Sequence, residues 1–227
     1  LFVEKPIALT AKEADHLTRL ACDKNLSLQV GHQERYVSKA IGLFDFDNAL
    51  KAIKCIRQVP NSGRCDDVSV VFDLMIHDID IVRQITGSDF VAINANGSAD
   101  EAEVKLVLAN GVSVYLEAGR CASNPERRIE LEFDNGKVVA DFLNRTIEDT
   151  TPTGQKRSFA EASKSSVALD DPLAFGAELF VQSILEGAAD GVSGGSAGAA
   201  VQWAEAIEAL IEDEVGGAEG ANQRLRA

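Results

Sequence analysis

LFVEKPIALTAKEADHLTRLACDKNLSLQVG, residues 1–31, is the stretch of sequence that decides the fold. Two short apolar runs, 1–3 and 26–30, have the length of buried β-strands. Between them, Thr10 and Glu13 form a capping box that opens a helix with an apolar stripe. A strand, a helix and a strand within about 30 residues predict a βαβ crossover, so we expect the two strands to run parallel.

Longer elements are expected after this unit. The pattern predicts a helix over 37–50, a strand over 52–59 and a second helix over 68–86. The helix over 68–86 is apolar on nearly every side, whereas a surface helix has one polar face. We therefore expect this helix to be buried in the middle of the protein.

A series of β runs and two closing helices complete the chain. Strands are expected at 89–97, 102–109, 112–121, 127–134, 137–143 and 145–150, and helices at 172–186 and 196–214, with a frayed tail after Val215. Asn110-Gly111 and the Asp-Asn-Gly triplet at 134–136 are hairpin signals, because Asn and Gly accept a positive φ. The spacing of the runs therefore predicts a mostly antiparallel sheet.

Composition excludes several classes of partner. The formal net charge is −14, from 36 acidic and 22 basic residues, so a polyanion meets net repulsion at this surface. Nucleic acid and anionic membranes are therefore not expected as partners, and no apolar run of about 18 residues could span a membrane. The four cysteines show no metal-ligand spacing. We expect reduced thiols, no metal site and a cytoplasmic location.

The expected core helix carries three ionisable groups. Asp73 and His77 are four residues apart and Asp80 lies three further on, so in a regular α-helix they share one face. A carboxylate one turn from an imidazole can fix its tautomer and raise its basicity, which prepares the histidine to accept a proton. The alternative is a core histidine with an intrahelical partner. Burying several polar groups is costly unless they line a cavity, so the functional interpretation is favoured.

Two further candidates follow the two strands of the βαβ unit. Lys5 comes directly after the first strand, and Pro6 makes the backbone there rigid. The segment GHQERY, 31–36, comes after the second strand, and parallel strands bind ligands at this shared carboxyl edge. The alternatives are an ordinary solvated lysine and an ordinary polar loop.

Three motifs carry a family resemblance: VEKPIALT at 3–10, VGHQERY at 30–36 and DLMIHDID at 73–80. In this order and at these separations they resemble the Gfo/Idh/MocA family of oxidoreductases. The resemblance implies that 1–31 are the last βαβ unit of a Rossmann dinucleotide-binding domain. Residues 32–227 would then form an open, mostly antiparallel sheet domain with helices on one face, which binds the substrate and forms a homodimer or homotetramer through the sheet.

The same resemblance implies a cofactor, NAD or NADP, whose glycine-rich loop lies outside these residues. About 90 residues containing that loop are expected to precede Leu1, so cofactor binding by this chain should be compromised. The residue that selects NAD or NADP would lie in that segment, and the choice stays open.

Site roles follow from the resemblance position by position. The implied catalytic residues are Lys5, Asp73 and His77, the cofactor-binding residues are Glu4, Lys5 and Gln33, and the substrate-binding residues are Arg35, Arg64 and Asp80. The implied reaction is oxidation of a secondary alcohol, in which His77, oriented by Asp73, takes the hydroxyl proton and Lys5 stabilises the developing alkoxide. Which of Lys5 and His77 is the formal base stays open.

The implied substrate is a sugar. A UDP-linked amino sugar is favoured, because Arg64 could bind a diphosphate bidentately. A free sugar or inositol is the alternative within the family. An alternative of another class is a catalytically silent module for ligand binding or oligomerisation, if the chain holds no cofactor.

Overall fold

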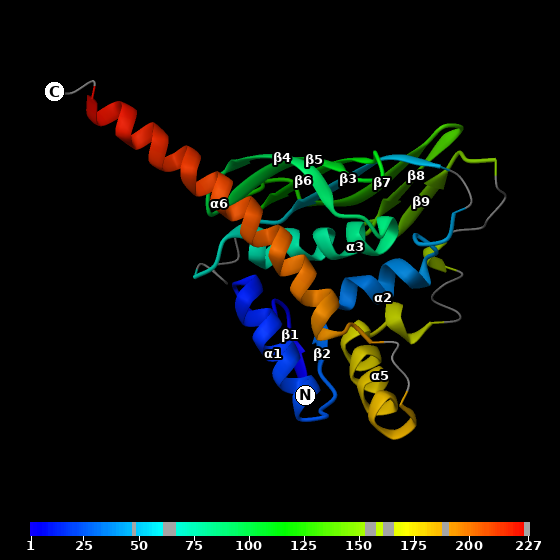
Figure 1. Ribbon diagram of the computed structural model, residues 1–227. Helices are drawn as coiled ribbons and strands as arrows, with labels where there is room; N and C mark the ends of the chain where they lie inside the picture. The colour runs from blue at the N-terminus through cyan, green and yellow to red at the C-terminus, as the bar shows by residue number, and fades with distance from the viewer. Residues whose placement is uncertain (47–48, 61–66, 153–157, 161–165, 188–190, 225–227) are drawn as a thin grey trace.

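The computed structural model describes residues 1–46, 49–60, 67–152, 158–160, 166–187 and 191–224, with side chains up to residue 212. A large sheet lies at one end of the molecule and a small parallel βαβ unit at the other, with helices between them (Figure 1). This arrangement confirms the expected fold class, an α/β unit followed by an open sheet domain.

The βαβ unit consists of β1 (Phe2–Glu4), α1 (Ala11–Asp23) and β2 (Gln29–Gly31), and its two strands pair in parallel as predicted. The capping box is also confirmed, because Thr10 Oγ1 accepts a hydrogen bond of 3.2 Å from the backbone N–H of Glu13. The second strand begins at Gln29, three residues later than predicted. Asn25 has a φ of 52° and the N–H of Leu26 donates to the carbonyl of Ala21, so this stretch still belongs to the end of α1.

The next helix, α2, spans Gln33–Ala40, so the prediction of a helix over 37–50 was wrong at both ends. The GHQERY segment is therefore mostly the start of a helix and not a polar loop. Gly42 terminates α2 with a φ of 77°, and the N–H groups of Gly42 and Leu43 donate to the carbonyls of Lys39 and Ser38. A left-handed glycine closing the last turn is a common helix stop.

The large sheet has seven strands in the order β4-β5-β6-β3-β7-β8-β9. Its strands are β3 (Leu50–Gln58), β4 (Phe90–Gly97), β5 (Glu101–Leu108), β6 (Ser113–Gly119), β7 (Glu126–Phe133), β8 (Gly136–Asp141) and β9 (Thr146–Asp149). The β3–β6 pair is parallel and every other pair is antiparallel, which confirms a mostly antiparallel sheet.

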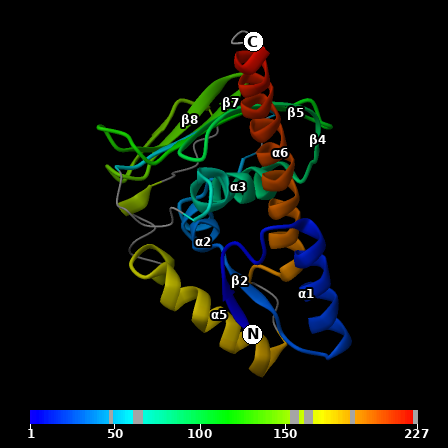
Figure 2. The same ribbon diagram turned by 90° about the vertical axis from the view of Figure 1, so that its left-hand side faces the viewer.

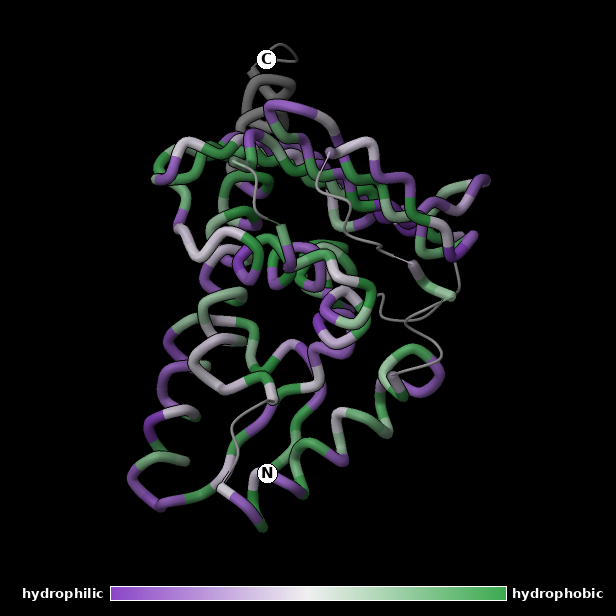
Figure 3. Tube along the Cα trace, turned by 90° about the vertical axis from the view of Figure 1, so that its right-hand side faces the viewer, coloured by the Kyte–Doolittle hydropathy of each residue, from purple (hydrophilic) through white to green (hydrophobic). Residues whose placement is uncertain are grey.

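Helices cover one face of this sheet and the other face is open (Figures 1 and 2). Hydrophobic and hydrophilic residues alternate along the strands (Figure 3), and β5 is buried at every second position. This alternation is what a sheet with one covered face requires.

The helix expected in the core is present as two connected parts: a π-helix, η1 (Val71–Met75), followed by α3 (Ile76–Thr86). Most of its apolar side chains are enclosed, with Val71, Met75 and Ile79 each 0% exposed. The prediction of a buried helix is confirmed. The π-turn was not predicted, and it lies at the candidate residue Asp73.

Two helices close the described chain: α5 (Pro172–Glu186), preceded by the short η2 (Val167–Leu169), and α6 (Gly194–Arg224). The bounds of α5 match the prediction. Helix α6 begins earlier than expected because the Ser193 Oγ accepts from the N–H of Ser196 at 3.2 Å, which caps the first turn. The helix continues to Arg224, so the frayed tail expected after Val215 is not observed.

Candidate active site

The candidate site forms where the end of β1 meets η1. The Lys5 ammonium donates to the backbone carbonyl of Asp73, and its Nζ lies 3.3 Å from the carboxylate Oδ1 of the same residue. Both side chains are about four-fifths buried, with exposed fractions of 18% and 19%. The structure thus brings together two predicted site residues that are 68 positions apart in the sequence.

His77 is half-buried, with one ring nitrogen enclosed by the protein. Its Nδ1 is buried and has no hydrogen-bond partner among the described residues. Burial, followed by the positive charges of Arg57 and Lys5, holds the pKa of His77 well below its ordinary value of 6.5. The expectation that Asp73 raises the basicity of His77 is therefore contradicted, because Asp73 pairs with Lys5 instead.

The π-helix accounts for this difference. In η1 the N–H of Ile76 donates to the carbonyl of Val71, a spacing of five residues instead of four. Residues four apart therefore do not share one face as they do in a regular α-helix. Asp73 therefore contacts Lys5, while the ring of His77 lies edge-on to the ring of His32.

The predicted cofactor-binding residues gather at the carboxyl edge of the two parallel strands. Gln33 Nε2 donates to Glu4 Oε1 at 3.5 Å, and Lys5 is adjacent in sequence. A Cβ on Gly31 would lie 2.9 Å from a carboxylate oxygen of Glu4, so a larger residue there would displace the Glu4 side chain from this edge. An amide, an ammonium and a carboxylate on one sheet edge are suited to the polar end of a nicotinamide, and this part of the site fits such a cofactor.

The predicted substrate-binding residues Arg35 and Asp80 bind one another. Arg35 Nε donates to Asp80 Oδ2 at 2.9 Å, its Nη2 donates to the other carboxylate oxygen, and Nη2 also donates to Ser196 Oγ at 2.8 Å. The two side chains are 12% and 2% exposed. In this geometry Asp80 holds Arg35 in place, while Arg64 lies outside the described residues.

A second buried ion pair lies behind His77 and was missed by the sequence analysis. Arg57 donates two hydrogen bonds to Asp78, at 2.9 and 2.7 Å, and its Nη1 lies 3.6 Å from Glu34 Oε1. Glu34 also pairs with Arg127, whose pKa burial lowers to about 10. The available signal was Arg57 itself, since in strand β3 it shares the covered face with apolar residues, and a buried arginine requires a carboxylate.

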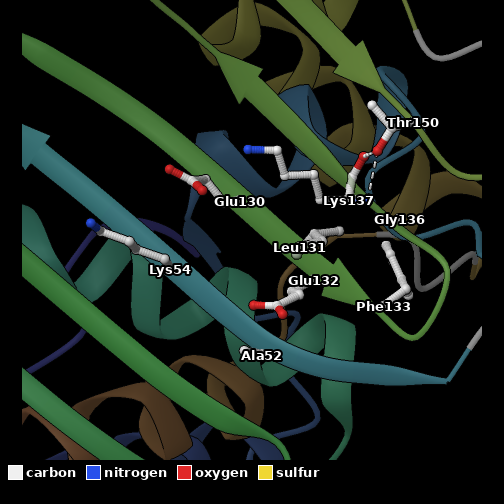
Figure 4. A pocket seen from close by; sticks show the side chains of 9 residues that line it. All are labelled: Ala52, Lys54, Glu130, Leu131, Glu132, Phe133, Gly136, Lys137 and Thr150. Atoms are coloured by element: carbon white, nitrogen blue, oxygen red, sulfur yellow. Dashed lines mark hydrogen bonds between the residues drawn. The ribbon is translucent and has the colours of Figure 1, made fainter.

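Several hollows lie on the part of the molecule that the structure describes, and two of them are relevant to the site. One, of about 550 Å³, lies on the open face of the sheet, where Lys54, Glu130, Glu132 and Lys137 surround it (Figure 4). The other, of about 600 Å³, adjoins Arg35 and is lined by aromatic and polar side chains from α2, α3 and α5. The second hollow is therefore the one connected to the candidate site.

Metal binding and membrane insertion have no structural support in the described chain. No group of three or more His, Cys, Asp or Glu side chains is arranged to hold a metal ion in the ranges that the structure describes. No described helix combines the length and the apolar character that crossing a bilayer requires.

Comparison with known proteins gives the class of the protein. Residues 57–139 match the model of the GFO/IDH/MocA C-terminal domain. Together with the relatives below, this match makes the chain similar to the Gfo/Idh/MocA family of oxidoreductases.

Individual members of this family are similar to the chain. The chain is 34% identical over 153 residues to UDP-N-acetylglucosamine 3-dehydrogenase of Acidithiobacillus ferrooxidans, a match covering 64% of this chain and 49% of that protein. A crystal structure of the same protein superposes with a TM-score of 0.78 at 27% identity, covering 93% of this chain and 70% of that one. The chain thus spans about half the length of the curated relative in that alignment.

A more distant structure shares the fold. The scyllo-inositol dehydrogenase of Lactobacillus casei, solved with NAD(H) and scyllo-inositol, has a TM-score of 0.65 at 21% identity. The match covers 94% of this chain and 71% of that chain.

Proposed function

We propose that this chain is the substrate-binding part of an NAD(P)-dependent dehydrogenase that oxidises a secondary hydroxyl of a sugar. The favoured substrate is a UDP-linked amino sugar. Residues 1–31 are proposed to complete a Rossmann dinucleotide-binding domain, and 32–227 to form the domain for substrate binding and oligomerisation. The cytoplasmic location stays a prediction.

A single observation carries this proposal: the Lys5 ammonium is held by Asp73 directly beside the helix that presents His77. Lys5 lies at the carboxyl edge of the parallel strands, where α/β proteins bind nucleotides. The π-helix that carries Asp73 joins this edge to the sheet domain. A cation and an imidazole therefore lie at the junction between the proposed cofactor-binding and substrate-binding parts.

Each of these groups has a separate role in the proposed oxidation. A bound nicotinamide supplies the hydride acceptor for the carbinol carbon. His77 is proposed to take the hydroxyl proton, because a neutral imidazole carries a lone pair for it; the lowered pKa of His77 keeps the ring neutral near neutral pH and makes it a weaker base. Lys5, positioned by Asp73, would stabilise the negative charge that develops on the same oxygen. Glu4 and Gln33 would hold the polar end of the cofactor.

The similarity to the Acidithiobacillus enzyme supports a nucleotide-sugar substrate. The hollow beside Arg35 supports it as well, because Phe175 and Tyr36 meet edge to face there, with ring centroids 5.5 Å apart, next to Lys39. Aromatic and cationic side chains in one hollow suit a base and a phosphate group. The scyllo-inositol ligand of the more distant structure supports the alternative, a free cyclitol or sugar.

The open face of the sheet is the proposed oligomer interface. It carries both charge signs, with Lys54, Glu130, Glu132 and Lys137 close together (Figure 4). A homodimer or homotetramer through this face would cover the hollow. Sedimentation of the wild-type protein and of a Lys54→Glu variant tests this arrangement, because the reversed charge should weaken self-association.

The function is tested with the complete gene product that contains this chain. We expect reduced nicotinamide to accumulate when NAD or NADP is supplied with UDP-N-acetylglucosamine, but not with myo-inositol or scyllo-inositol. His77→Asn should abolish turnover, and His16→Asn, on the exposed face of α1, should not change it. Turnover of the inositols alone would favour the cyclitol alternative. Cofactor binding absent from the complete protein would favour the silent module.

A further inference from the structure

His32 lies at the junction of β2 and α2 and is fully buried, with an exposed fraction of 0%. Neither ring nitrogen has a hydrogen-bond partner in the part of the chain that the structure describes. Leaving a buried polar atom unpaired costs about 1–3 kcal/mol, so native proteins rarely tolerate two on one side chain. A purely structural core histidine would have partners, and His32 therefore calls for another explanation.

Two ionisable side chains lie beside this ring. Its Nδ1 lies 3.9 Å from Asp80 Oδ2. Its ring lies edge-on to the ring of His77, with a centroid distance of 6.2 Å and an interplanar angle of 79°. His77 Nδ1 is itself buried and unpaired among the described residues. Asp80 and His77 are thus both neighbours of the His32 ring.

We propose that His32 is a positioning residue for His77, as the middle member of an Asp80–His32–His77 chain that fixes the tautomer of the proton-accepting imidazole. The inference rests on the proposed function, because it assigns His77 as the group that faces the substrate hydroxyl. The family motif at 30–36 thereby acquires a role for its histidine in addition to its arginine.

The tautomers follow from the contacts. Asp80 is held by Arg35, and its Oδ2, 3.9 Å from His32 Nδ1, would accept from the Nδ1–H of His32 after a small approach, which would leave the lone pair of His32 Nε2 free. That lone pair accepts from the Nδ1–H of His77, either after a small approach of the rings or through one bridging water. His77 Nε2 then carries its lone pair towards the substrate. When it takes the hydroxyl proton, the imidazolium that forms is stabilised by the hydrogen bond to His32 and by the charge of Asp80.

Burial and the surrounding charges keep both imidazole rings neutral before the reaction. Burial is the main cause that lowers the pKa of His32; Arg35 and Lys5 add to it and Asp80 opposes it. The pKa of His77 is lowered by burial and by Arg57 and Lys5. Two neutral imidazoles can share one ordered set of hydrogen bonds, whereas two imidazolium rings would repel.

Two substitutions at His32 separate a positioning role from a packing role. In His32→Asn the amide replaces Nδ1 and can still donate to Asp80, but nothing reaches His77. In His32→Gln the amide reaches the place of Nε2 and can accept from His77. In the complete gene product we expect kcat to fall by about 10- to 100-fold in His32→Asn with KM nearly unchanged, and most of the activity to return in His32→Gln.

A second measurement does not depend on turnover. The 227-residue chain has only three histidines, so a ¹⁵N-histidine spectrum contains three imidazoles, and His16→Asn assigns one of them. We expect His32 and His77 both to carry their proton on Nδ1. In His32→Asn the proton of His77 should move to Nε2 or divide between the two nitrogens.

The outcomes separate this inference from the proposed function. An active wild-type enzyme whose His32→Asn variant keeps its kcat, or a His77 protonated on Nε2 in the wild type, would overturn the positioning role and leave the function intact. The expected tautomers in a protein that oxidises no sugar would overturn the function and leave the three-residue chain in place.

Discussion

Asp78→Asn is expected to destabilise the fold strongly, because it removes the carboxylate from a buried ion pair. Asp78 and Arg57 are 4% and 6% exposed at their side chains, and two hydrogen bonds of 2.9 and 2.7 Å join them. The neutral amide leaves the guanidinium buried, with Glu34 at 3.6 Å as its nearest remaining carboxylate. Removing one partner of such a pair costs about 3–5 kcal/mol.

Urea unfolding measures this loss. The fluorescence of Trp203, the single tryptophan, reports on the core, since it is 1% exposed. With a slope of about 2 kcal/mol per molar urea, the unfolding midpoint should fall by about 2 M. Circular dichroism on the same samples checks that helices and core unfold together.

A matched variant provides the control. Asp15→Asn makes the same change in the exposed Asp15–Arg19 pair on α1, whose side chains are 55% and 75% exposed, and should scarcely move the midpoint. The double variant Arg57→Met with Asp78→Leu should recover much of the stability, because a nonpolar pair of similar volume avoids the unpaired charge. Equal midpoints for Asp78→Asn and Asp15→Asn would refute the reasoning.

Three further outcomes are expected. Lys5→Met should lower kcat/KM by about 100-fold or more in the sugar oxidation assay, since it removes the cation that stabilises the alkoxide. The folded chain holds the pKa of His32 and of His77 below 6.5, so the unfolded chain binds more protons once the pH falls below about 6.5. The free energy of unfolding should therefore decrease on acidification through that range. Calorimetry at about pH 7 and pH 5 should show a smaller decrease for the double variant with Asn at both positions. Gly97→Ala should destabilise by about 1–3 kcal/mol in urea, since φ is 152° and the added Cβ would lie 2.1 Å from a carbonyl oxygen, whereas Gly195→Ala, with open space around it, should be neutral or slightly stabilising.

Local patterns were sufficient to predict the sheet and most of its connections. Each strand of the sheet alternates between the covered and the open face, and the turn at Gly111 has the positive φ of 87° that its Asn-Gly signal predicted. The error in α2 arose where polarity was read as a loop. Glu34 and Arg35 are polar because they form ion pairs with distant elements, and such pairs leave no local pattern.

The sequence predicted which residues form the candidate site better than it predicted which of them contact one another. Lys5 and Asp73 were both named, but their contact joins segments 68 residues apart, and the sequence placed Asp73 against His77. The missing information was the π-turn, which no residue pattern marks. His32 was passed over because a histidine after a glycine is unremarkable until the structure shows that both its nitrogens are buried.

The π-turn fits one extra residue into this helix while its two ends keep their orientation to one another. Each residue of an α-helix turns the chain by about 100° around the axis, and the π-turn closes its hydrogen bond over five residues instead of four. Winding Val71–Met75 as a regular α-helix with no residue removed would therefore rotate one end against the other by about 100°, the turn of one residue. Either Asp73 would turn away from Lys5, or His77 would turn away from His32. Deleting one residue there would instead restore regular winding and leave both ends of the helix close to their present orientation.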